Sequence, residues 1–261
     1  MDSPGDRTAP GAPLHDAVLL SLGDPEAAAR ELTVLLERGL DPDGPDEDGL
    51  TPLYAAAVQG AAGLVRLLLA AGAAPDRPSG TEGLPLCAAA VWGHLAVVRE
   101  LLAAGARPDA REEFDLTPLA WAVRGGHVEV VDALLDAGAD PDLPGAGEES
   151  PLCAAADRGS PAIVRALLGR GAVAGGAQAL ATARRWSALD VEAELTARLR
   201  AAHSAPEARC SVRRALGAGG TERVEVWLLG PDGGPRSSDS RDAGHAEVVR
   251  LLEAVRPGGS A

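Results

Sequence analysis

The chain has 261 residues, 46% of them apolar, which allows a sizeable core and indicates a globular rather than a disordered protein. All of its basic side chains are arginines, and the absence of lysine excludes the enzyme classes that depend on a Schiff-base, phosphate-loop or kinase-type lysine. The net charge is −14: residues 1–174 carry 27 acidic and 12 basic side chains, and residues 175–261 carry 11 and 12. The acidic part disfavours direct binding to nucleic acid or anionic membranes and favours a basic partner.

The first elements are expected after a flexible N-terminus at residues 1–10. A helix begins near Pro13-Leu14-His15-Asp16-Ala17-Val18, and a second helix runs from Leu32 to Arg38 and ends at Gly39. A longer turn through Gly23-Asp24-Pro25 separates them. We interpret residues 11–43 as an N-terminal capping repeat, because the terminal units of a repeat array are atypical.

The next four segments repeat one pattern with a spacing of 33 residues. Three columns keep this spacing in one register: Pro52, Pro85, Pro118 and Pro151; Gly60, Gly93, Gly126 and Gly159; and Gly72, Gly105, Gly138 and Gly171. A fourth column, Pro42, Pro75, Pro108 and Pro141, stands before aspartate each time. The repeats are therefore placed at residues 44–76, 77–109, 110–142 and 143–174.

Each repeat is expected to form two short helices. Threonine or serine before proline, as in Thr51-Pro52, is an N-cap followed by the residue favoured at the first helical position. Glycine at Gly60 suits the left-handed cap that ends this helix. In residues 128–135, apolar side chains recur at helical spacing. One such pair cannot bury its own apolar face, so neighbouring repeats must stack.

These residues resemble the ankyrin repeat family, whose signature is Thr-Pro-Leu-His-x-Ala. The matches are Thr51-Pro52-Leu53-Tyr54-Ala55-Ala56, Leu84-Pro85-Leu86-Cys87-Ala88-Ala89, Thr117-Pro118-Leu119-Ala120-Trp121-Ala122 and Ser150-Pro151-Leu152-Cys153-Ala154-Ala155. The resemblance implies an all-α ankyrin-type α-solenoid of stacked helix-turn-helix repeats. The signature histidine is replaced in all four repeats, so we expect a missing or weaker inter-repeat hydrogen bond and a less rigid array.

The remaining residues depart from this period. Leu180 to Leu195 repeats the pattern of Leu152 to Leu167 with an offset of 28, so residues 175–202 are interpreted as a C-terminal capping helix pair. Residues 203–261 form a tail with a possible hairpin at 209–229, a disordered polar linker at 235–241 and an amphipathic helix at 244–253. The tail is either a degenerate end unit that shields the last repeat or a separate functional element.

No motif indicates catalysis, a metal or a cofactor. His94 and His127 stand at equivalent positions of adjacent repeats, roughly 8–10 Å apart by helix spacing, too far to share one ion. The glycine cluster at 169–176 lacks the spacing of dinucleotide or phosphate loops. We therefore expect a non-enzyme without cofactor or metal, although a triad formed only in space escapes a reading of the sequence.

A binding surface follows from the resemblance, because the family contacts partners through extended fingers and the exposed side of the first helices. At the end of the first helices, the 33-residue register places Trp92 and Arg158 in one row. Aromatic and arginine side chains are the usual interface anchors. Tyr54 and Trp121 have an equally good alternative role, which is packing between repeats. The candidate partner-binding residues are Asp48, Leu50, Tyr54, Glu82, Trp92, Glu112, Glu113, Phe114, Asp115, Trp121, Arg124 and Arg158.

The sequence therefore predicts a protein-interaction adaptor or regulator whose acidic fingers and concave face bind a partner with a basic patch. Two alternatives stay open. One is an inhibitor or immunity-type protein that blocks a basic enzyme, and the other is an enzyme whose site needs residues 203–261.

The cysteines and the first residues indicate the compartment. Cys87, Cys153 and Cys210 lack paired spacing, as expected in a reducing environment. Residues 1–6 show no signal-peptide pattern, and the most apolar stretch is short and interrupted by Arg66. We expect a cytoplasmic protein.

Overall fold

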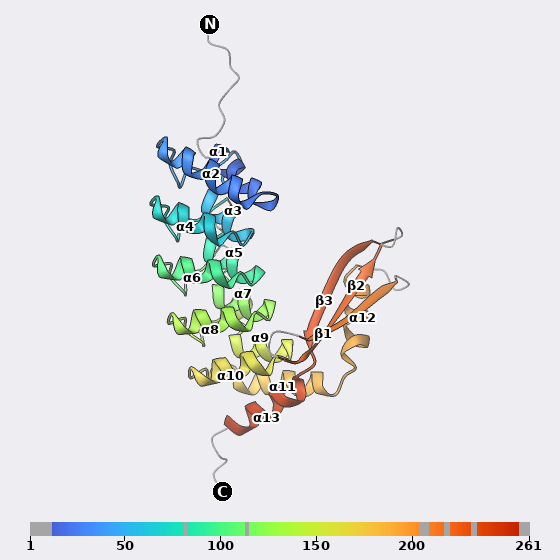
Figure 1. The fold of residues 1–261 in the computed structure, drawn as a ribbon. Coiled ribbons are helices and arrows are strands. Elements are labelled where there is room, and N and C mark those ends of the chain that lie inside the picture. Colours follow the sequence, from blue (N-terminus) through green and yellow to red (C-terminus); the bar gives the residue numbers. More distant parts are fainter. Residues whose placement is uncertain are drawn as a thin grey trace. The chain divides into compact units, whose positions relative to one another are not determined.

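The computed structural model describes residues 12–80, 83–112, 115–203, 209–216, 220–230 and 234–255. The chain divides into two compact units, which are described separately. The N-terminal unit comprises residues 1–125 and 132–140, and the C-terminal unit comprises residues 126–131 and 141–261. Figure 1 labels the elements of both.

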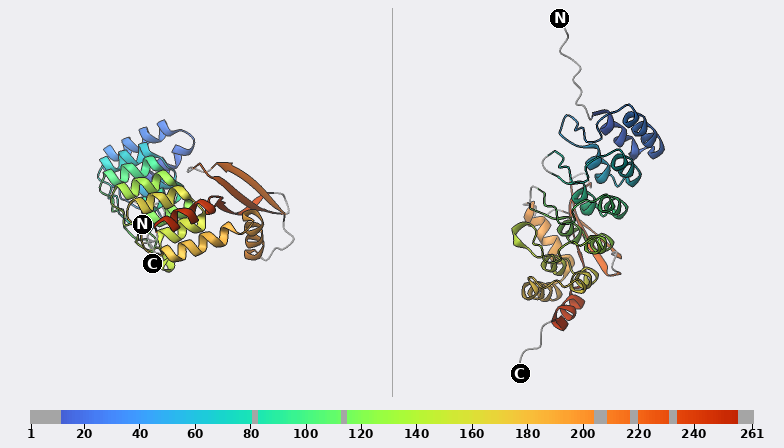
Figure 2. Two further views of the ribbon diagram at one scale, coloured as in Figure 1. Left: turned by 90° about the horizontal axis from the view of Figure 1, so that it is seen from below. Right: turned by 90° about the vertical axis from the view of Figure 1, so that its left-hand side faces the viewer.

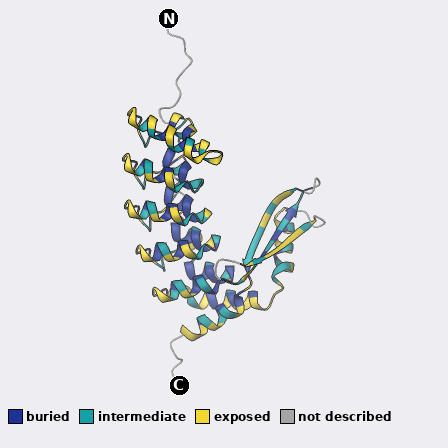
Figure 3. Ribbon diagram, in the orientation of Figure 1, coloured by how far each residue is buried: buried dark blue, intermediate teal, exposed yellow. Residues whose placement is uncertain are grey.

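The N-terminal unit is built from helix pairs. First helices α1, α3, α5 and α7 pack side by side, and second helices α2, α4 and α6 form a parallel row. The bounds are α1 Ala12–Leu19, η1 Leu20–Leu22, α2 Pro25–Glu37, α3 Pro52–Val58, α4 Ala62–Ala70, α5 Pro85–Trp92, α6 Leu95–Ala103, α7 Pro118–Gly125 and α8 Val128–Asp136. Figure 3 shows the first helices mostly buried, so the core lies along them.

The predicted helix boundaries are confirmed at the caps. The Thr51 hydroxyl accepts a hydrogen bond from the Tyr54 amide at 3.3 Å, and the Thr117 hydroxyl does the same for Ala120 at 3.1 Å. Leu84 makes no side-chain cap, as its sequence predicted. Gly60 has a φ of +71°, the left-handed conformation expected where the first helix ends.

The aspartates of the Pro-Asp column connect each repeat to the next. Asp43 accepts from the Ala74 amide at 3.0 Å, Asp76 accepts from Arg107 at 3.1 Å, and Asp109 accepts from Asp140 at 3.0 Å. In the C-terminal unit, Asp142 accepts from Val173 at 2.9 Å. We call Asp43, Asp76, Asp109 and Asp142 the inter-repeat aspartates. Their carboxylates satisfy backbone donors, so part of the acidic composition serves the fold.

The residues that replace the signature histidine make only weak contacts to the following repeat. The Cys87 thiol donates to the Leu116 carbonyl at 4.0 Å, and the Cys153 thiol donates to the Gly175 carbonyl at 3.4 Å. A thiol is a weak donor. The expectation of a weakened inter-repeat hydrogen bond therefore holds at these two positions.

The C-terminal unit begins with one regular helix pair, α9 (Pro151–Arg158) and α10 (Pro161–Gly169). The remaining elements are η2 Ala146–Glu148, α11 Gly176–Ser187, α12 Val191–Ala202, β1 Cys210–Leu216, β2 Glu222–Leu229, β3 Pro235–Asp242 and α13 His245–Val255. The strands form an antiparallel sheet in the order β1-β2-β3, and α12 packs against β2 and β3 on one face of it (Figure 2).

The last repeat of this unit is split. Helix α11 packs against α9 as a first helix, and α13, not α12, packs against both α11 and α10 as the second helix of that pair. His245 at the start of α13 lies 3.1 Å from the Asp157 carbonyl, and His94 at the start of α6 lies 3.0 Å from the Val58 carbonyl. Asp157 and Val58 occupy the same register position, so His245 fills the place of a second-helix histidine.

Segment 188–244 is therefore an insertion within one repeat, and we call its described α12 and β1–β3 the inserted module. Three predictions need correction. Residues 175–202 are not a capping pair, because α12 packs against β2 and β3, with Leu195 on Val224 and Val226, while α13 packs beside α11. The polar segment 235–241 is strand β3, not a disordered linker, because its backbone pairs with β2. The fold is not purely all-α, since the hairpin and β3 form a sheet.

Candidate functional site

The fingers are the extended segments that precede the first helices. The first finger of the N-terminal unit, at residues 46–48, is stabilised by Asp46. Asp46 accepts hydrogen bonds from the Asp48 and Leu50 amides at 3.0 and 2.8 Å, and its other oxygen lies 3.2 Å from His15 Nδ1. Asp48 is exposed and Leu50 is half-buried. A Cβ on Gly80 would lie 3.0 Å from Leu50, so this side chain packs against the next finger. Asp48 is the member of this pair that is open to a partner.

Tyr54, Leu84, Cys87, Glu112 and Trp121 gather at the base of the next fingers, and we call them the finger-base cluster. Trp121 Nε1 donates to Glu112 at 2.5 Å, and Trp121 packs against Leu84 and Cys87. The Tyr54 ring lies under the second finger, where a Cβ on Gly83 would come within 2.9 Å of it.

Burial governs the titration of this cluster. It raises the pKa of the Glu112 carboxyl, although the hydrogen bonds from Trp121 and Cys87 oppose the rise. Burial and then the Glu112 charge raise the pKa of both the Tyr54 phenol and the Cys87 thiol. A protonated thiol is a poor nucleophile, so Cys87 acts as a small packing residue.

The cluster changes the role of three sequence-predicted site residues. Tyr54, Glu112 and Trp121 are all half-buried and contact other repeats. Packing between repeats, the alternative left open for Tyr54 and Trp121, describes their position. Glu112 is not a free acidic group at a finger tip, because its carboxylate is engaged by Trp121.

Trp92 lies at the end of α5 with 62% of its surface exposed. Tryptophan is enriched among the residues that carry most of the binding energy of protein interfaces. Arg124, near the end of α7, is exposed as well. Asp115 is exposed, has a φ of +58° and pairs with Arg111 at 2.8 Å. Glu82, Glu113 and Phe114 lie outside the described residues.

Arg158 is the predicted partner residue that the structure contradicts. It lies in the C-terminal unit, is 7% exposed, and its Nε is 3.7 Å from the Asp242 carboxylate. Arg223 of β2 pairs with the same Asp242 at 3.0 Å. Its register position predicted exposure, but the inserted module covers it.

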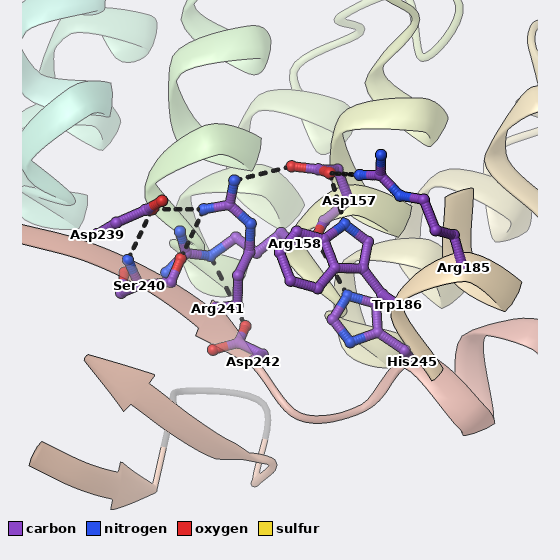
Figure 4. A network of polar contacts seen from close by, with 9 residues as sticks. All are labelled: Asp157, Arg158, Arg185, Trp186, Asp239, Ser240, Arg241, Asp242 and His245. Atoms are coloured by element: carbon purple, nitrogen blue, oxygen red, sulfur yellow. Dashed lines mark hydrogen bonds and ion pairs between the residues drawn. The ribbon is translucent and has the colours of Figure 1, made fainter. Parts of the chain in front are cut away.

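A polar network joins the inserted module to the split repeat (Figure 4). Arg241 of β3 donates to Asp157 of α9 at 2.9 Å and to Asp239 at 2.7 Å. Trp186 of α11 donates from Nε1 to the same Asp157 at 2.8 Å. Four arginines pair with three aspartates in this network, so every carboxylate faces at least one guanidinium group: Arg158, Arg185, Arg223 and Arg241 with Asp157, Asp239 and Asp242.

Trp186 is the centre of this network. It is 1% exposed and stacks on His245, with the ring centroids 5.5 Å apart and an interplanar angle of 17°. The guanidinium carbons of Arg185, Arg198 and Arg241 each lie 5.6 Å from its ring centroid. An indole between an imidazole and several guanidinium groups fixes α11, α13 and β3 together.

Burial in the network shifts the pKa values of Arg158 and His245. Burial lowers the pKa of the Arg158 guanidinium to about 10, with the Asp242 charge opposing the change, so Arg158 stays charged at neutral pH. Burial also lowers the pKa of His245, and the hydrogen bond to the Asp157 carbonyl opposes it. His245 is therefore neutral near pH 7 and donates from Nε2 to that carbonyl.

Metal and membrane sites have no support in the described part of the chain. No group of three or more histidine, cysteine or carboxylate side chains there is arranged to hold a metal ion. Within the same ranges, no helix combines the length and apolarity that a bilayer crossing requires.

The roles of Trp186, Arg241 and Asp242 were missed because they depend on contacts distant in sequence. One signal was available. Gly244-His245 copies Gly126-His127, the opening of a second helix, and a count of second helices would have marked α13 as the partner of α11.

A comparison with protein-family models identifies the repeats. A model described as ankyrin repeats in three copies matches residues 14–112 and 86–175. No curated protein matches the chain. Proteins of this family generally mediate protein–protein interactions and are typically non-catalytic. The matched ranges and the helix pairs agree, and the chain belongs to the ankyrin repeat family.

Proposed function

We propose that this protein is a non-catalytic adaptor or regulator that binds a protein partner through the N-terminal unit. The observation that carries the proposal is Trp92, an indole 62% exposed at the end of a first helix. Large aromatic side chains supply most of the binding energy in many interfaces. The contact centres on Trp92, with Asp48, Asp115 and Arg124 around it.

The partner is proposed to be basic at the contact. The N-terminal unit is strongly acidic, because its residues 1–125 and 132–140 carry 22 acidic against 9 basic side chains. It stays acidic after Asp43, Asp76, Asp109 and Glu112 are assigned to the fold. Such a field accelerates the encounter with a basic protein at low salt. The absence of paired cysteine spacing supports a reducing compartment, and we place the protein in the cytoplasm.

Comparative capture tests the proposal. Wild-type chain, Trp92→Ala and Leu22→Ala are immobilised at equal density and exposed to lysate, and retained proteins are quantified by mass spectrometry. Leu22 is a matched control, because it is an exposed apolar residue of the same unit, 76% exposed. We expect a protein retained by wild type and Leu22→Ala but reduced by about tenfold or more with Trp92→Ala.

The charge proposal is tested separately with the retained partner. Reversal of Glu47 and Asp48 to lysine is expected to slow association at low salt and to have less effect at high salt. A retained protein that binds wild type and Trp92→Ala equally contradicts the Trp92 surface. A retained set dominated by one basic enzyme, inhibited on binding, would instead identify an inhibitor.

A further inference from the structure

Strand β1 of the C-terminal unit is an edge of the sheet. In the order β1-β2-β3, β2 is the one strand that pairs with it among the residues that the structure describes. Residues 211–214 are exposed, and Leu216 is 81% exposed (Figure 3). An exposed edge strand presents unpaired backbone donors and acceptors to another strand.

The alternation of backbone hydrogen bonds along β1 shows which residues present those groups. The Leu229 amide donates to the Arg209 carbonyl at 2.9 Å, so Arg209 directs its backbone toward β2. Antiparallel strands alternate between inward and outward backbone groups. Val212, Arg214 and Leu216 of β1 therefore direct theirs away from β2.

The side of the sheet that carries α12 extends past α12 as an apolar strip. Val224 and Val226 pack with Leu195 and Leu199 of α12. Their cross-strand partners, Arg214 and Val212, share that face. Val212 is 38% exposed and Leu216 is 81% exposed, whereas α12 packs mainly over β2 and β3.

The charges differ between the two faces of β1. Arg214, on the α12 face, is neutralised by Glu192 at 2.8 Å and Glu222 at 3.0 Å. Arg213, on the other face, is exposed and lies opposite Glu225. An added strand thus meets apolar groups, Val212 and Leu216, on one face and the Arg213 guanidinium on the other.

We propose that the β1 edge binds an extended peptide that alternates apolar and acidic residues, as a fourth strand of the sheet. Backbone hydrogen bonds to Val212 and Arg214 supply affinity, the apolar side chains cover Val212 and Leu216, and an acidic side chain pairs with Arg213. The proposal concerns the C-terminal unit and does not depend on the Trp92 surface.

A second copy of the chain is a poorer occupant. Arg213 is the middle residue of β1, Cys210–Leu216. The twofold antiparallel pairing that overlaps all of β1 is centred on Arg213 and places Arg213 opposite Arg213, and like charges directly opposite each other are destabilising. An acidic peptide removes this repulsion and replaces it with attraction.

The experiment uses the full chain and a fluorescein-labelled nine-residue peptide of alternating valine and glutamate, followed by anisotropy. We expect saturable binding by wild type and by Trp92→Ala. Arg213→Glu and Val212→Pro are each expected to weaken it by about tenfold, since the first reverses the charge and the second removes one outward amide. A control peptide of alternating valine and lysine should bind wild type more weakly than the valine–glutamate peptide does, and should bind Arg213→Glu more tightly than it binds wild type.

Hydrogen exchange keeps the test valid if Val212→Pro fails to fold. In wild type alone, the amides of Val212 and Arg214 should exchange faster than those of Ser211 and Arg213, and the probe should slow Val212 and Arg214. The proposal is overturned if wild type does not bind the probe, if binding is insensitive to Arg213→Glu, or if exchange at Val212 is unchanged. It is also overturned if the chain dimerises with these amides already protected.

Discussion

The contacts that complete a repeat join residues close in sequence in the N-terminal unit and residues distant in sequence in the C-terminal unit. In the N-terminal unit, each inter-repeat aspartate bonds to a backbone amide 31 residues away, and the same bond recurs from repeat to repeat. In the C-terminal unit, the split repeat is completed by Arg241 and His245, which reach Asp157 across 84 and 88 residues. Closing the longer loop of the C-terminal unit costs more chain entropy.

The difference explains the chemistry of each junction. A short-range contact that recurs needs only one carboxylate per repeat, because neighbouring helix pairs are already adjacent in the chain. The inserted module needs a buried indole, a stacked imidazole and ion pairs from three arginines to Asp242 and Asp157 to return α13 to its place beside α11. The C-terminal unit is therefore expected to be more sensitive to single substitutions than the N-terminal unit.

Trp186→Ala should have the largest effect. Removing a 1% exposed indole leaves a cavity among α11, α12 and the sheet, and we expect a loss of about 3–5 kcal/mol in the free energy of unfolding. Urea denaturation followed by circular dichroism measures it. Trp92→Ala is the matched control, because the same change at a 62% exposed indole should cost little stability. Equal losses in the two variants would remove the contrast between the units.

Asp242→Asn should have the next largest effect. It neutralises the carboxylate that faces Arg158 and Arg223 and leaves a buried guanidinium with less compensation. Removing one partner of a buried pair costs about 3 kcal/mol. Glu253→Gln, which weakens an exposed pair with Arg184, should cost less than about 1 kcal/mol. A loss for Asp242→Asn no larger than that of Glu253→Gln would mean that the network does not hold the inserted module.

Asp76→Ala tests one inter-repeat contact of the N-terminal unit. The change removes the acceptor of the Arg107 amide, and we expect a loss of about 1 kcal/mol because the bond is charge-assisted but exposed. Hydrogen exchange at Arg107 should accelerate, and the amides of Ala74 and Asp140 report the neighbouring repeats. Glu47→Ala, at an exposed finger residue, is the control. Unchanged exchange at Arg107 would show that the contact contributes nothing.

The smallest expected effect is a pH dependence carried by His245. Burial lowers its pKa, so the folded state takes up a proton less readily than the unfolded state, and stability falls as the pH drops below the unfolded pKa of about 6.5. Thermal melts between about pH 7.5 and about pH 5.5 should show a decrease for wild type. His245→Gln retains a side-chain donor that cannot titrate, and should show a shallower decrease. Parallel curves would assign the dependence to other groups.

The sequence alone predicted everything that recurs in the repeats. Pro52 and Gly60 mark where a helix begins and ends through local backbone preferences, and the 33-residue period places every copy of them. Trp92 was correctly placed at the end of its helix for the same reason. The hairpin and the final helix also followed from local patterns, because alternation and helical spacing act within a few residues.

Only the tertiary structure decided which helix completes the last repeat and which side chains are open to a partner. Leu195 matched the repeat pattern, yet it packs in the core of the inserted module, and α13 takes the place expected of α12. Arg158 occupies a position that predicts exposure, but Asp242 of the distant strand β3 engages it. Glu112 was expected at an exposed finger, but folding buries it against Trp121 and Cys87. Local preferences determine where helices begin and end, whereas burial depends on which distant surfaces meet, and no period in the sequence records that choice.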